Sequence, residues 1–598
     1  MLVDSKRKIT TLQTLKKIIF MIIKSNRINF LFLIVLGVLS SLFLTINTFA
    51  MEKFFDSATE LSNKSATVEE TIFYGIFFLV IFLLNNILNS TFNLQGGNFF
   101  NIAAGYLTNF INKKASRLEP IDYENIETLD YINKAHQGVT GGVLFVGVIN
   151  MIITSYIPYF IFMGIYLFNL NSKLLYLLLC VFIPVIINEV IKTNLFENLE
   201  NKLAHIRREF DFYEKCIVDR EYFKETRHLG IFSYLNKKYN SSLNKMIKKS
   251  WKIEKKSNLI EILIRLVTIL GYGVILLVLF TSLINKEISI GAFGAVLSSI
   301  GMLFSKTEEI ICIHIGNISK NFGALKNLVY FLELEEKNNK VVTIKTPPTI
   351  EFKNVYFSYP YCKEFVLQNI NFTIDSQETI AIVGKNGSGK STLVKLILGL
   401  YYPTKGEVVF DGYNSKDISR DSIIENSSAV FQNFNKYKFT LGENVAISNI
   451  KKIDNKKIIY ELKNMDINFN IKKFPDKLDT NLSKEFGSID LSGGEWQKIA
   501  IARGLYKFNN LIILDEPTAA IDPIEEGRIF RKFKEISKGR TSIIVTHRMG
   551  TIKIANRIII LENGEINGIG THDELLKSNK MYFEMYNSQS KWYYKSNN

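Results

Sequence analysis

Long apolar segments are confined to residues 1–320 of this 598-residue chain, and each approaches the length of a membrane-crossing helix. A bilayer core requires about 20 consecutive apolar residues per helix. Six segments satisfy or approach that requirement, and we expect each to cross the membrane once: 28–50, 71–90, 141–168, 173–190, 259–284 and 290–313. The sequence therefore predicts an all-α, six-helix membrane domain whose two ends lie on the same side.

The loops between these segments predict their orientation. Residues 51–70 contain five carboxylates and two lysines, whereas the N-terminal arm, residues 91–140 and residues 191–257 carry most of the Lys and Arg. Basic loops stay on the cytoplasmic side of a membrane. We therefore place these three segments in the cytoplasm and expect the helices beside the two long loops to continue beyond the bilayer. Frequent Lys, Asn and Ile are typical of AT-rich bacterial genomes, so we expect a bacterial cytoplasmic membrane.

The formal net charge of +16 does not by itself indicate nucleic-acid binding. Lys and Arg form no stripe with interleaved aromatic residues, and many of them flank apolar segments, where anionic lipid accounts for them. We therefore expect the lipid bilayer, and no nucleic acid, as a partner.

Ionisable side chains also fall inside or near the expected helices: Glu189, Glu261, Arg265, Lys306, Glu308 and Glu309. Such groups are costly in a membrane, so they usually face the interior of the helix bundle or a wet cavity. The alternative is that they lie on cytoplasmic extensions of the helices, solvated or paired. For Glu261 and Arg265, four residues apart, we expect a solvated pair on one helix. For Glu308 and Glu309 both alternatives stay open.

The pattern changes after a polar linker at residues 335–349. Over residues 350–598, short β-branched strands alternate with amphipathic helices, the pattern of a mainly parallel sheet covered by helices. The predicted organisation is thus a transmembrane domain at 1–334, a linker at 335–349 and an α/β domain at 350–598.

One apolar strand of this α/β domain, Thr379–Val383, runs directly into a match to G-x-x-x-x-G-K-[ST] at residues 384–391. The glycines of such a loop let backbone N–H groups surround a phosphate at the positive end of the following helix. We expect Lys390 to reach the β- and γ-phosphates and Ser391 to ligate Mg²⁺. The candidate nucleotide contacts of this segment are Gly384, Asn386, Gly387, Ser388, Gly389, Lys390, Ser391 and Thr392.

Two further strands end in residues that suit the same chemistry. Leu511–Leu514 is followed by Asp515 and Glu516, and Ser542–Val545 is followed by Thr546 and His547. An acid after a core strand is where Mg²⁺ is held beside a phosphate loop, so Asp515 is the candidate metal ligand. Glu516 is placed to polarise the attacking water. His547 is either a capped surface residue or, beside the other two motifs, a contact to the γ-phosphate.

The segment Leu491-Ser492-Gly493-Gly494-Glu495 resembles the signature sequence of ATP-binding-cassette proteins. Other positions are similar to the elements of that family's α/β P-loop NTPase domain. Tyr359 matches the aromatic residue that stacks on adenine, and Gln432 matches the glutamine that joins the Mg²⁺ site to the membrane domain. Asp522, in Ala519–Asp522, matches the loop that crosses the dimer interface, and His547 matches the switch histidine. The six-helix plan with two long cytoplasmic loops resembles the exporters of this family.

The resemblance implies an ATPase that uses ATP and Mg²⁺ to drive export. Two cassettes close head to tail over two ATP molecules, with Ser492, Gly493 and Gly494 contacting the phosphate bound by the partner's loop. Closure draws together coupling segments near residues 120–130 and 219–227. Since every catalytic position is intact in one chain, a homodimer with two competent sites is expected. Glu495 departs from the usual glutamine, which puts only the tuning of the closed state in doubt.

Four stretches are most similar to exporters of ribosomally made, modified peptides, notably lantibiotics: 219–239, 382–395, 431–437 and 491–503. The resemblance implies a peptide cargo, with peptide-modifying enzymes as possible partners. Only about 27 residues precede the first expected span, and they contain no Cys, so the cysteine protease of some peptide exporters is not expected. A separate protease then removes any leader. A free carboxylate at Glu308 or Glu309 would favour cationic cargo.

Other classes of protein remain as alternatives. A multidrug or lipid exporter shares every cassette feature. A nucleotide-gated channel or regulatory ATPase is disfavoured because Glu516 and His547 are present. An importer is disfavoured because the membrane helices and the cassette are fused, and a scaffold for peptide-modifying enzymes could coexist with export.

Overall fold

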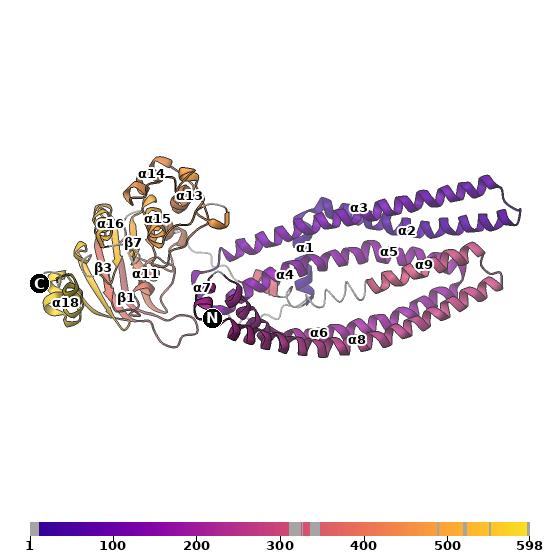
Figure 1. Cartoon of the computed structure of the whole chain (residues 1–598), viewed down its shortest axis with the longest axis horizontal. Helices are drawn as coiled ribbons and strands as arrows, with labels where there is room; N and C mark the ends of the chain where they lie inside the picture. The colour runs from indigo at the N-terminus through magenta and orange to yellow at the C-terminus, as the bar shows by residue number, and fades with distance from the viewer. Residues whose placement is uncertain are drawn as a thin grey trace. The chain divides into compact units, whose positions relative to one another are not determined.

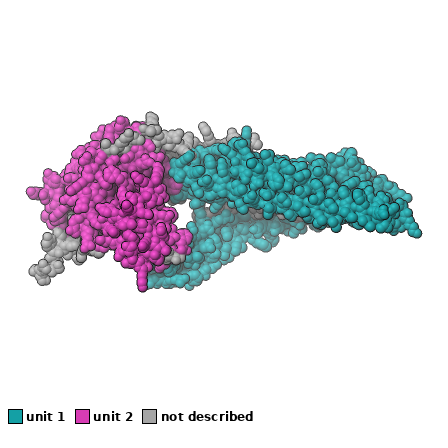
Figure 2. All heavy atoms as spheres, turned by 90° about the horizontal axis from the view of Figure 1, so that it is seen from above, with its two compact units in different colours: residues 1–117, 127–335 teal, residues 118–126, 336–598 magenta. Residues whose placement is uncertain are grey.

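The computed structural model describes two compact units, coloured separately in Figure 2: residues 1–117 with 127–335, and residues 118–126 with 336–598. We call them the helical unit and the sheet unit. The described residues are 11–219, 221–309, 325, 327–334, 342, 347–486, 489–517, 523–548 and 552–594. Most of the predicted linker, 335–349, lies outside them. A short segment of the first cytoplasmic loop, residues 118–126, groups with the sheet unit.

The helical unit contains several long helices together with shorter ones (Figure 1). They are α1 (Thr11–Ser25), α2 (Arg27–Ser62), α3 (Val68–Ala115), α4 (Ile126–Met151), η2 (Ile152–Tyr156), α5 (Ile157–Leu170), α6 (Ser172–Val218), α7 (Phe223–His228), α8 (Phe232–Ile284) and α9 (Ile290–Glu308). Helices α3, α6 and α8 have 48, 47 and 53 residues. At 1.5 Å per residue each is more than twice as long as a bilayer core of about 30 Å is thick. They therefore continue past the predicted spans, as expected.

Four helical stretches of the described chain are long and apolar enough to cross a membrane: 27–62, 68–115, 127–170 and 232–284. They contain the predicted spans 28–50, 71–90, 141–168 and 259–284. Residues 290–306 form a shorter apolar helix, and the end of the last predicted span lies outside the described residues. Only 6% of the most apolar stretch of α3 is buried. Such an outward-facing apolar surface is suited to lipid.

The helices pack around an apolar core, and hydrogen bonds that involve polar side chains link them near its edges. Side chains of α5, α6, α8 and α9 form one buried cluster that includes Met163, Leu279 and Val296. The Tyr166 hydroxyl donates to Glu52 Oε2 at 2.8 Å, and Asp56 Oδ1 accepts from the backbone N–H of Gly291 at 2.8 Å. A carboxylate at the start of α9 compensates the unpaired N–H groups of its first turn.

The structure shows ion-pair partners for several charges in the expected helices. Arg265 and Glu261 form the expected i,i+4 ion pair, with 3.0 Å between Nη2 and Oε1. Lys306 Nζ donates to Glu309 Oε2 at 2.9 Å, so the Glu309 carboxylate has a cationic partner on its own helix. The side chains of Glu189 and Glu308 lie outside the part of the chain that the structure describes.

The sheet unit contains two sheets. The larger one has the strand order β10-β9-β3-β8-β7-β6, and its strands β3 (Thr379–Gly384), β6 (Ser427–Val430), β7 (Leu511–Asp515), β8 (Thr541–Val545) and β9 (Arg557–Glu562) are parallel. β10 (Glu565–Gly570) joins antiparallel. Every residue of β3, β7 and β8 is buried, as expected for central strands covered on both faces. The three predicted strands are therefore confirmed.

The smaller sheet is antiparallel, with the order β2-β1-β4-β5: β1 (Ile350–Phe357), β2 (Leu367–Ile374), β4 (Lys405–Phe410) and β5 (Tyr413–Asn414). The prediction of a mainly parallel sheet did not include it. Alternation of buried and exposed residues in β2 shows one face packed and one face solvated. The main helices of this unit are α11 (Lys390–Ile397), α12 (Arg420–Asn426), α13 (Leu441–Ala446), α14 (Asn455–Asn464), α15 (Gly493–Tyr506), α16 (Pro523–Ile536), α17 (His572–Ser578) and α18 (Lys580–Tyr594).

Candidate nucleotide-binding site

Three adjacent parallel strands bring the predicted motifs to one edge of the larger sheet. Strand β8 lies between β3 and β7, and the three run in the same direction. Because carboxyl ends of parallel strands meet at one edge, the phosphate loop after β3, the acidic pair at the end of β7 and His547 after β8 lie side by side. The sequence patterns predicted each strand, and the strand order supplies their juxtaposition.

The phosphate loop connects β3 to α11 through glycines that side chains would disturb. Gly387 and Gly389 have φ angles of 81° and 100°, which L-residues rarely adopt. A Cβ at Gly389 would also lie 2.7 Å from Leu367 Cδ2. Within the loop Asn386 and Gly387 are exposed, whereas Ser388 is buried. The loop thus presents backbone and small side chains at the start of α11.

Lys390, the first residue of α11, points back over this loop. Its Nζ donates to the carbonyl oxygens of Gly384 at 2.9 Å and Lys385 at 3.0 Å. The side chain is buried, and burial lowers the pKa of Lys390 although Glu516 and Asp515 oppose that effect. A cation held among carbonyl groups beside the loop is positioned for a phosphate.

Asp515 ends strand β7 in a buried position. Burial raises the pKa of this carboxyl, and a hydrogen bond with Ser391 opposes the rise. At this site Asp515 Oδ1 and Ser388 Oγ are both buried, and neither has a hydrogen-bond partner among the residues that the structure describes. Buried polar atoms normally have partners. An unpaired carboxylate oxygen beside the Ser391 hydroxyl is the oxygen-rich arrangement that Mg²⁺ prefers.

Glu516, the next residue, has a strained backbone and two side-chain neighbours. Its φ is 47°, a left-handed conformation that is uncommon for glutamate, and its side chain is buried. Gln432 Nε2 donates to Glu516 Oε2 at 2.8 Å, and His547 Nδ1 lies 3.3 Å from Glu516 Oε1. The strand order therefore brings Glu516, Gln432 and His547 together.

The predicted adenine-stacking residue, Tyr359, lies beside α11. Its hydroxyl is 3.1 Å from Thr392 Oγ1, and the Lys395 ammonium lies 5.6 Å from its ring centroid. One ring edge meets Tyr401 at a centroid distance of 6.0 Å. The aromatic face is thus held by packing and by a cation–π contact.

A polar network around Lys395 was not predicted from the sequence. Glu124, in the short helix η1 (Pro120–Glu124), accepts a hydrogen bond from the Tyr401 hydroxyl and lies 3.3 Å from Lys395 Nζ. The hydrogen bond from Tyr401 lowers the pKa of Glu124. Burial and that same bond raise the pKa of Tyr401 to about 12. Only the position of Glu124 in the expected coupling segment could have suggested this contact.

The signature segment begins helix α15, and a capping box and an ion pair hold it in place. Ser492 is the N-cap residue, and Glu495 completes a capping box by accepting from the Ser492 N–H at 2.8 Å. Glu495 Oε1 also accepts from Lys473 Nζ at 2.5 Å. Burial raises the pKa of Glu495, but the Lys473 and Ser492 hydrogen bonds outweigh it and lower the pKa. The departure from glutamine thus adds an ion pair to the capping box.

The remaining predicted positions are less closely joined to the phosphate loop. Gly493 and Gly494 form the exposed and half-buried first turn of α15 beside Ser492. That helix packs into a different hydrophobic cluster from the one around α11. Asp522, with Ala519–Ile521, lies outside the described residues.

Comparison with known proteins shows the family. Residues 367–519 match the family described as ABC transporter. The subtilin transport ATP-binding protein SpaT of Bacillus subtilis is 32% identical over 510 residues, which cover 82% of this chain and 81% of SpaT. The nisin transport ATP-binding protein NisT of Lactococcus lactis subsp. lactis is 40% identical over 243 residues, 40% of each chain.

The similarity extends to lipid flippases and to the fold of a solved exporter. The ATP-dependent lipid A-core flippase of Haemophilus influenzae (strain 86-028NP) is 32% identical over 357 residues, 59% of this chain and 60% of the flippase. A structure of a bacterial Atm1-family ABC exporter with ATP bound superposes with a TM-score of 0.75 at 20% identity, covering 95% of this chain and 98% of that one.

The chain therefore belongs to the ATP-binding-cassette transporters. Within that class it is an ATP-driven exporter, with a multi-pass helical membrane domain fused to a cytoplasmic ATPase domain.

Proposed function

We propose that this exporter carries a ribosomally synthesised, modified peptide across the bacterial cytoplasmic membrane and that it works as a homodimer. The observation that carries the proposal is the similarity to SpaT along four fifths of both chains, because it includes the membrane helices as well as the cassette. The higher identity to NisT over 40% of the chain supports the same cargo class.

The catalytic proposal assigns roles to groups already near one another. The phosphate loop binds the ATP phosphates through backbone N–H groups, with Lys390 at the β- and γ-phosphates and Tyr359 against the adenine. Ser391, Asp515 and Gln432 hold Mg²⁺, which when bound neutralises phosphate charge. Glu516 orients and polarises the attacking water, and His547 contacts the γ-phosphate from the neighbouring strand.

The proposed dimer completes each site from two chains. Ser492, Gly493 and Gly494 start helix α15, so their N–H groups lie at its positive end. In the dimer they contact the γ-phosphate bound by the partner's loop, and Asp522 lies at the interface. Hydrolysis then releases the contact that holds the two cassettes closed.

The lipid alternative rests on the similarity to lipid A-core flippases, which covers less of the chain. An experiment with the purified protein in vesicles distinguishes the two cargo classes. It compares the uptake of a lantibiotic precursor with the flipping of lipid A-core. ATP-dependent uptake of the peptide supports the proposal. Flipping of the lipid without peptide uptake would replace it by the alternative.

A further inference from the structure

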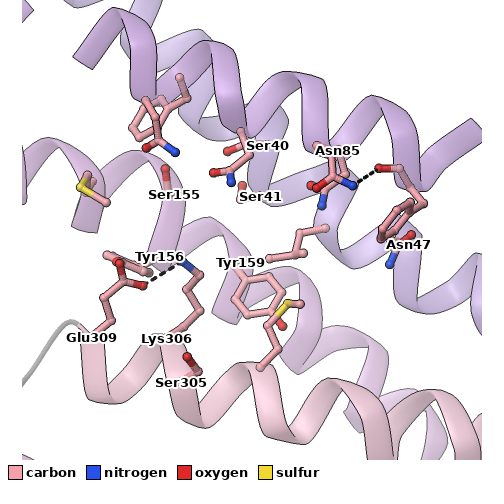
Figure 3. A pocket seen from close by; sticks show the side chains of 18 residues that line it. Ser40, Ser41, Asn47, Asn85, Ser155, Tyr156, Tyr159, Ser305, Lys306 and Glu309 are labelled. Carbon is pink, nitrogen blue, oxygen red and sulfur yellow. Dashed lines mark hydrogen bonds and ion pairs between the residues drawn. The ribbon is translucent and has the colours of Figure 1, made fainter. Parts of the chain in front are cut away.

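A cavity of about 520 Å³ lies inside the helical unit (Figure 3). Helices α2, α3, α5 and α9, the end of α4 and the π-helix η2 surround it, and many of the side chains that line it are polar. Ser40, Ser41 and Asn47 come from α2, within the predicted span 28–50. Polar groups at membrane depth are costly, and they usually mark a path for a solute.

Helix α3 contributes four asparagines to this lining: Asn85, Asn86, Asn89 and Asn93. Residues 85, 89 and 93 are spaced four apart, so they stack along one face of the helix. The fourth asparagine, Asn86, donates from Nδ2 to the Phe82 carbonyl of its own helix at 2.9 Å. The face thus offers amide donors and acceptors in a row of about 12 Å, given 1.5 Å per residue.

Three other groups of the lining are buried yet unpartnered. Asn47 Oδ1, Ser155 Oγ and Tyr159 OH have no hydrogen-bond partner among the residues that the structure describes. Leaving such groups unpaired is destabilising, so a native fold keeps them where something else supplies the bond. All three belong to one cavity, which indicates a ligand with hydrogen-bonding groups.

The backbone that presents Ser155 is itself irregular. Residues 152–156 form the π-helix η2, and Ser155 and Tyr156 line the cavity from it (Figure 3). Single π-turns within α-helices are rare and occur mostly at functional sites. Helix α2 approaches this turn closely at Gly37, where a Cβ would lie 2.4 Å from Thr154 Oγ1. The irregular turn is therefore fixed by the neighbouring helix.

The lining carries little net charge. Its charged members are Lys306 and Glu309, and these bind each other at 2.9 Å. Figure 3 shows this pair at the C-terminal end of α9, across the cavity from Ser40 and Ser41. An anionic headgroup therefore meets no excess of positive charge, and a cationic peptide meets no free Glu309 carboxylate.

We propose that this cavity binds the peptide main chain of the cargo through its uncharged amide and hydroxyl groups, largely independently of the net charge of the peptide. This inference rests on the proposed export of a peptide. Asparagine offers two donors and an acceptor, the same groups that alternate along a peptide backbone. Lipid acyl chains offer none of them, so the cavity favours an extended polypeptide over a lipid tail.

The test uses the full-length protein in vesicles and three synthetic 20-residue probes: an uncharged peptide, a matched peptide with net charge +4, and the uncharged peptide with N-methylated backbone amides. The half-maximal concentration for ATPase stimulation is measured for each. We expect the first two to agree within about threefold and the N-methylated probe to need about tenfold more, the equivalent of one lost hydrogen bond. Equal half-maximal concentrations for methylated and unmethylated peptides overturn the inference.

Substitutions in the cavity lining test whether the peptide acts at this cavity. Asn89→Leu and Ser155→Ala should each raise the half-maximal concentration of the uncharged peptide about five- to tenfold, while Asn98→Leu, on α3 but outside the cavity lining, should leave it unchanged. Thermal unfolding of each purified variant separates misfolding from lost binding. An unchanged half-maximal concentration of the uncharged peptide in both Asn89→Leu and Ser155→Ala defeats this inference alone. Lipid flipping with no response to any peptide defeats the proposed function as well.

Discussion

At the scale of residues, the acidic pair at the end of β7 shows what sequence can and cannot predict. Spacing after an apolar strand identified Asp515 and Glu516 as candidates. The left-handed backbone of Glu516 and its bond from Gln432 depend on the packing of residues 84 positions apart, which no local pattern encodes. The pairing of Glu309 with Lys306 was one of two open alternatives, because helical spacing permits the contact without requiring it.

The first prediction concerns the proposed base. Glu516→Gln keeps the shape and the Gln432 contact but removes the charge that polarises water, so we expect near-normal ATP affinity and a turnover lowered about 100-fold or more. ATP hydrolysis and ATP binding by the purified protein measure the two quantities. Glu565→Gln, an exposed carboxylate at the start of β10, is the matched control and should hydrolyse ATP at the wild-type rate. A normal rate in Glu516→Gln would remove the assignment.

At the scale of elements, apolar segments predicted the membrane helices because the bilayer sets both their length and their composition. The antiparallel sheet was not predicted, since β1 pairs with β4 over a long sequence separation, as in Ile350 with Phe410, and β5 has only two residues. The sequence also did not predict that η1 associates with the sheet unit. It depends on Glu124 meeting Tyr401 and Lys395, which follow it by 277 and 271 positions.

The second prediction concerns this contact. Glu124→Ala removes the acceptor for Tyr401 and the partner of Lys395, whereas Tyr401→Phe removes only the hydroxyl. Because the contact joins the loop after α3 to the end of α11, we expect ATP to bind normally but peptide stimulation of ATPase activity to fall about threefold or more in Glu124→Ala. Tyr401→Phe should show a smaller loss. Undiminished stimulation in both variants would show that this contact does not couple the loop to hydrolysis.

At the scale of the whole molecule, the arrangement of a six-helix membrane domain before a cassette predicted the exporter class, and the similarity to SpaT and to a solved exporter fold confirmed it. Cargo recognition could not be predicted in the same way. The cavity is lined by side chains from α2, α3, α4, η2, α5 and α9, and only the asparagines of α3 form a pattern visible in one segment. Their four-residue spacing is the signal that could have marked them.

The third prediction concerns the shared sites of the proposed homodimer. Ser492→Arg and Lys390→Ala chains should each be inactive alone. Mixed in equal amounts, they should recover about a quarter of the wild-type ATPase rate, because about half of the dimers are mixed and each mixed dimer has one intact site. Mixing two preparations of the same variant is the control. Failure to recover activity, with chain exchange demonstrated by differential labelling, would argue against sites built from two chains.

The measurement that tests the central claim most directly is uptake of a lantibiotic precursor into inside-out vesicles that contain the purified exporter, Mg²⁺ and ATP. We expect the peptide to accumulate with wild-type protein and ATP, and accumulation to stop with Glu516→Gln or without ATP. The same preparation assayed with lipid A-core should show no ATP-dependent flipping. ATP-driven lipid flipping without peptide accumulation, by a protein with normal ATPase activity, would contradict the account.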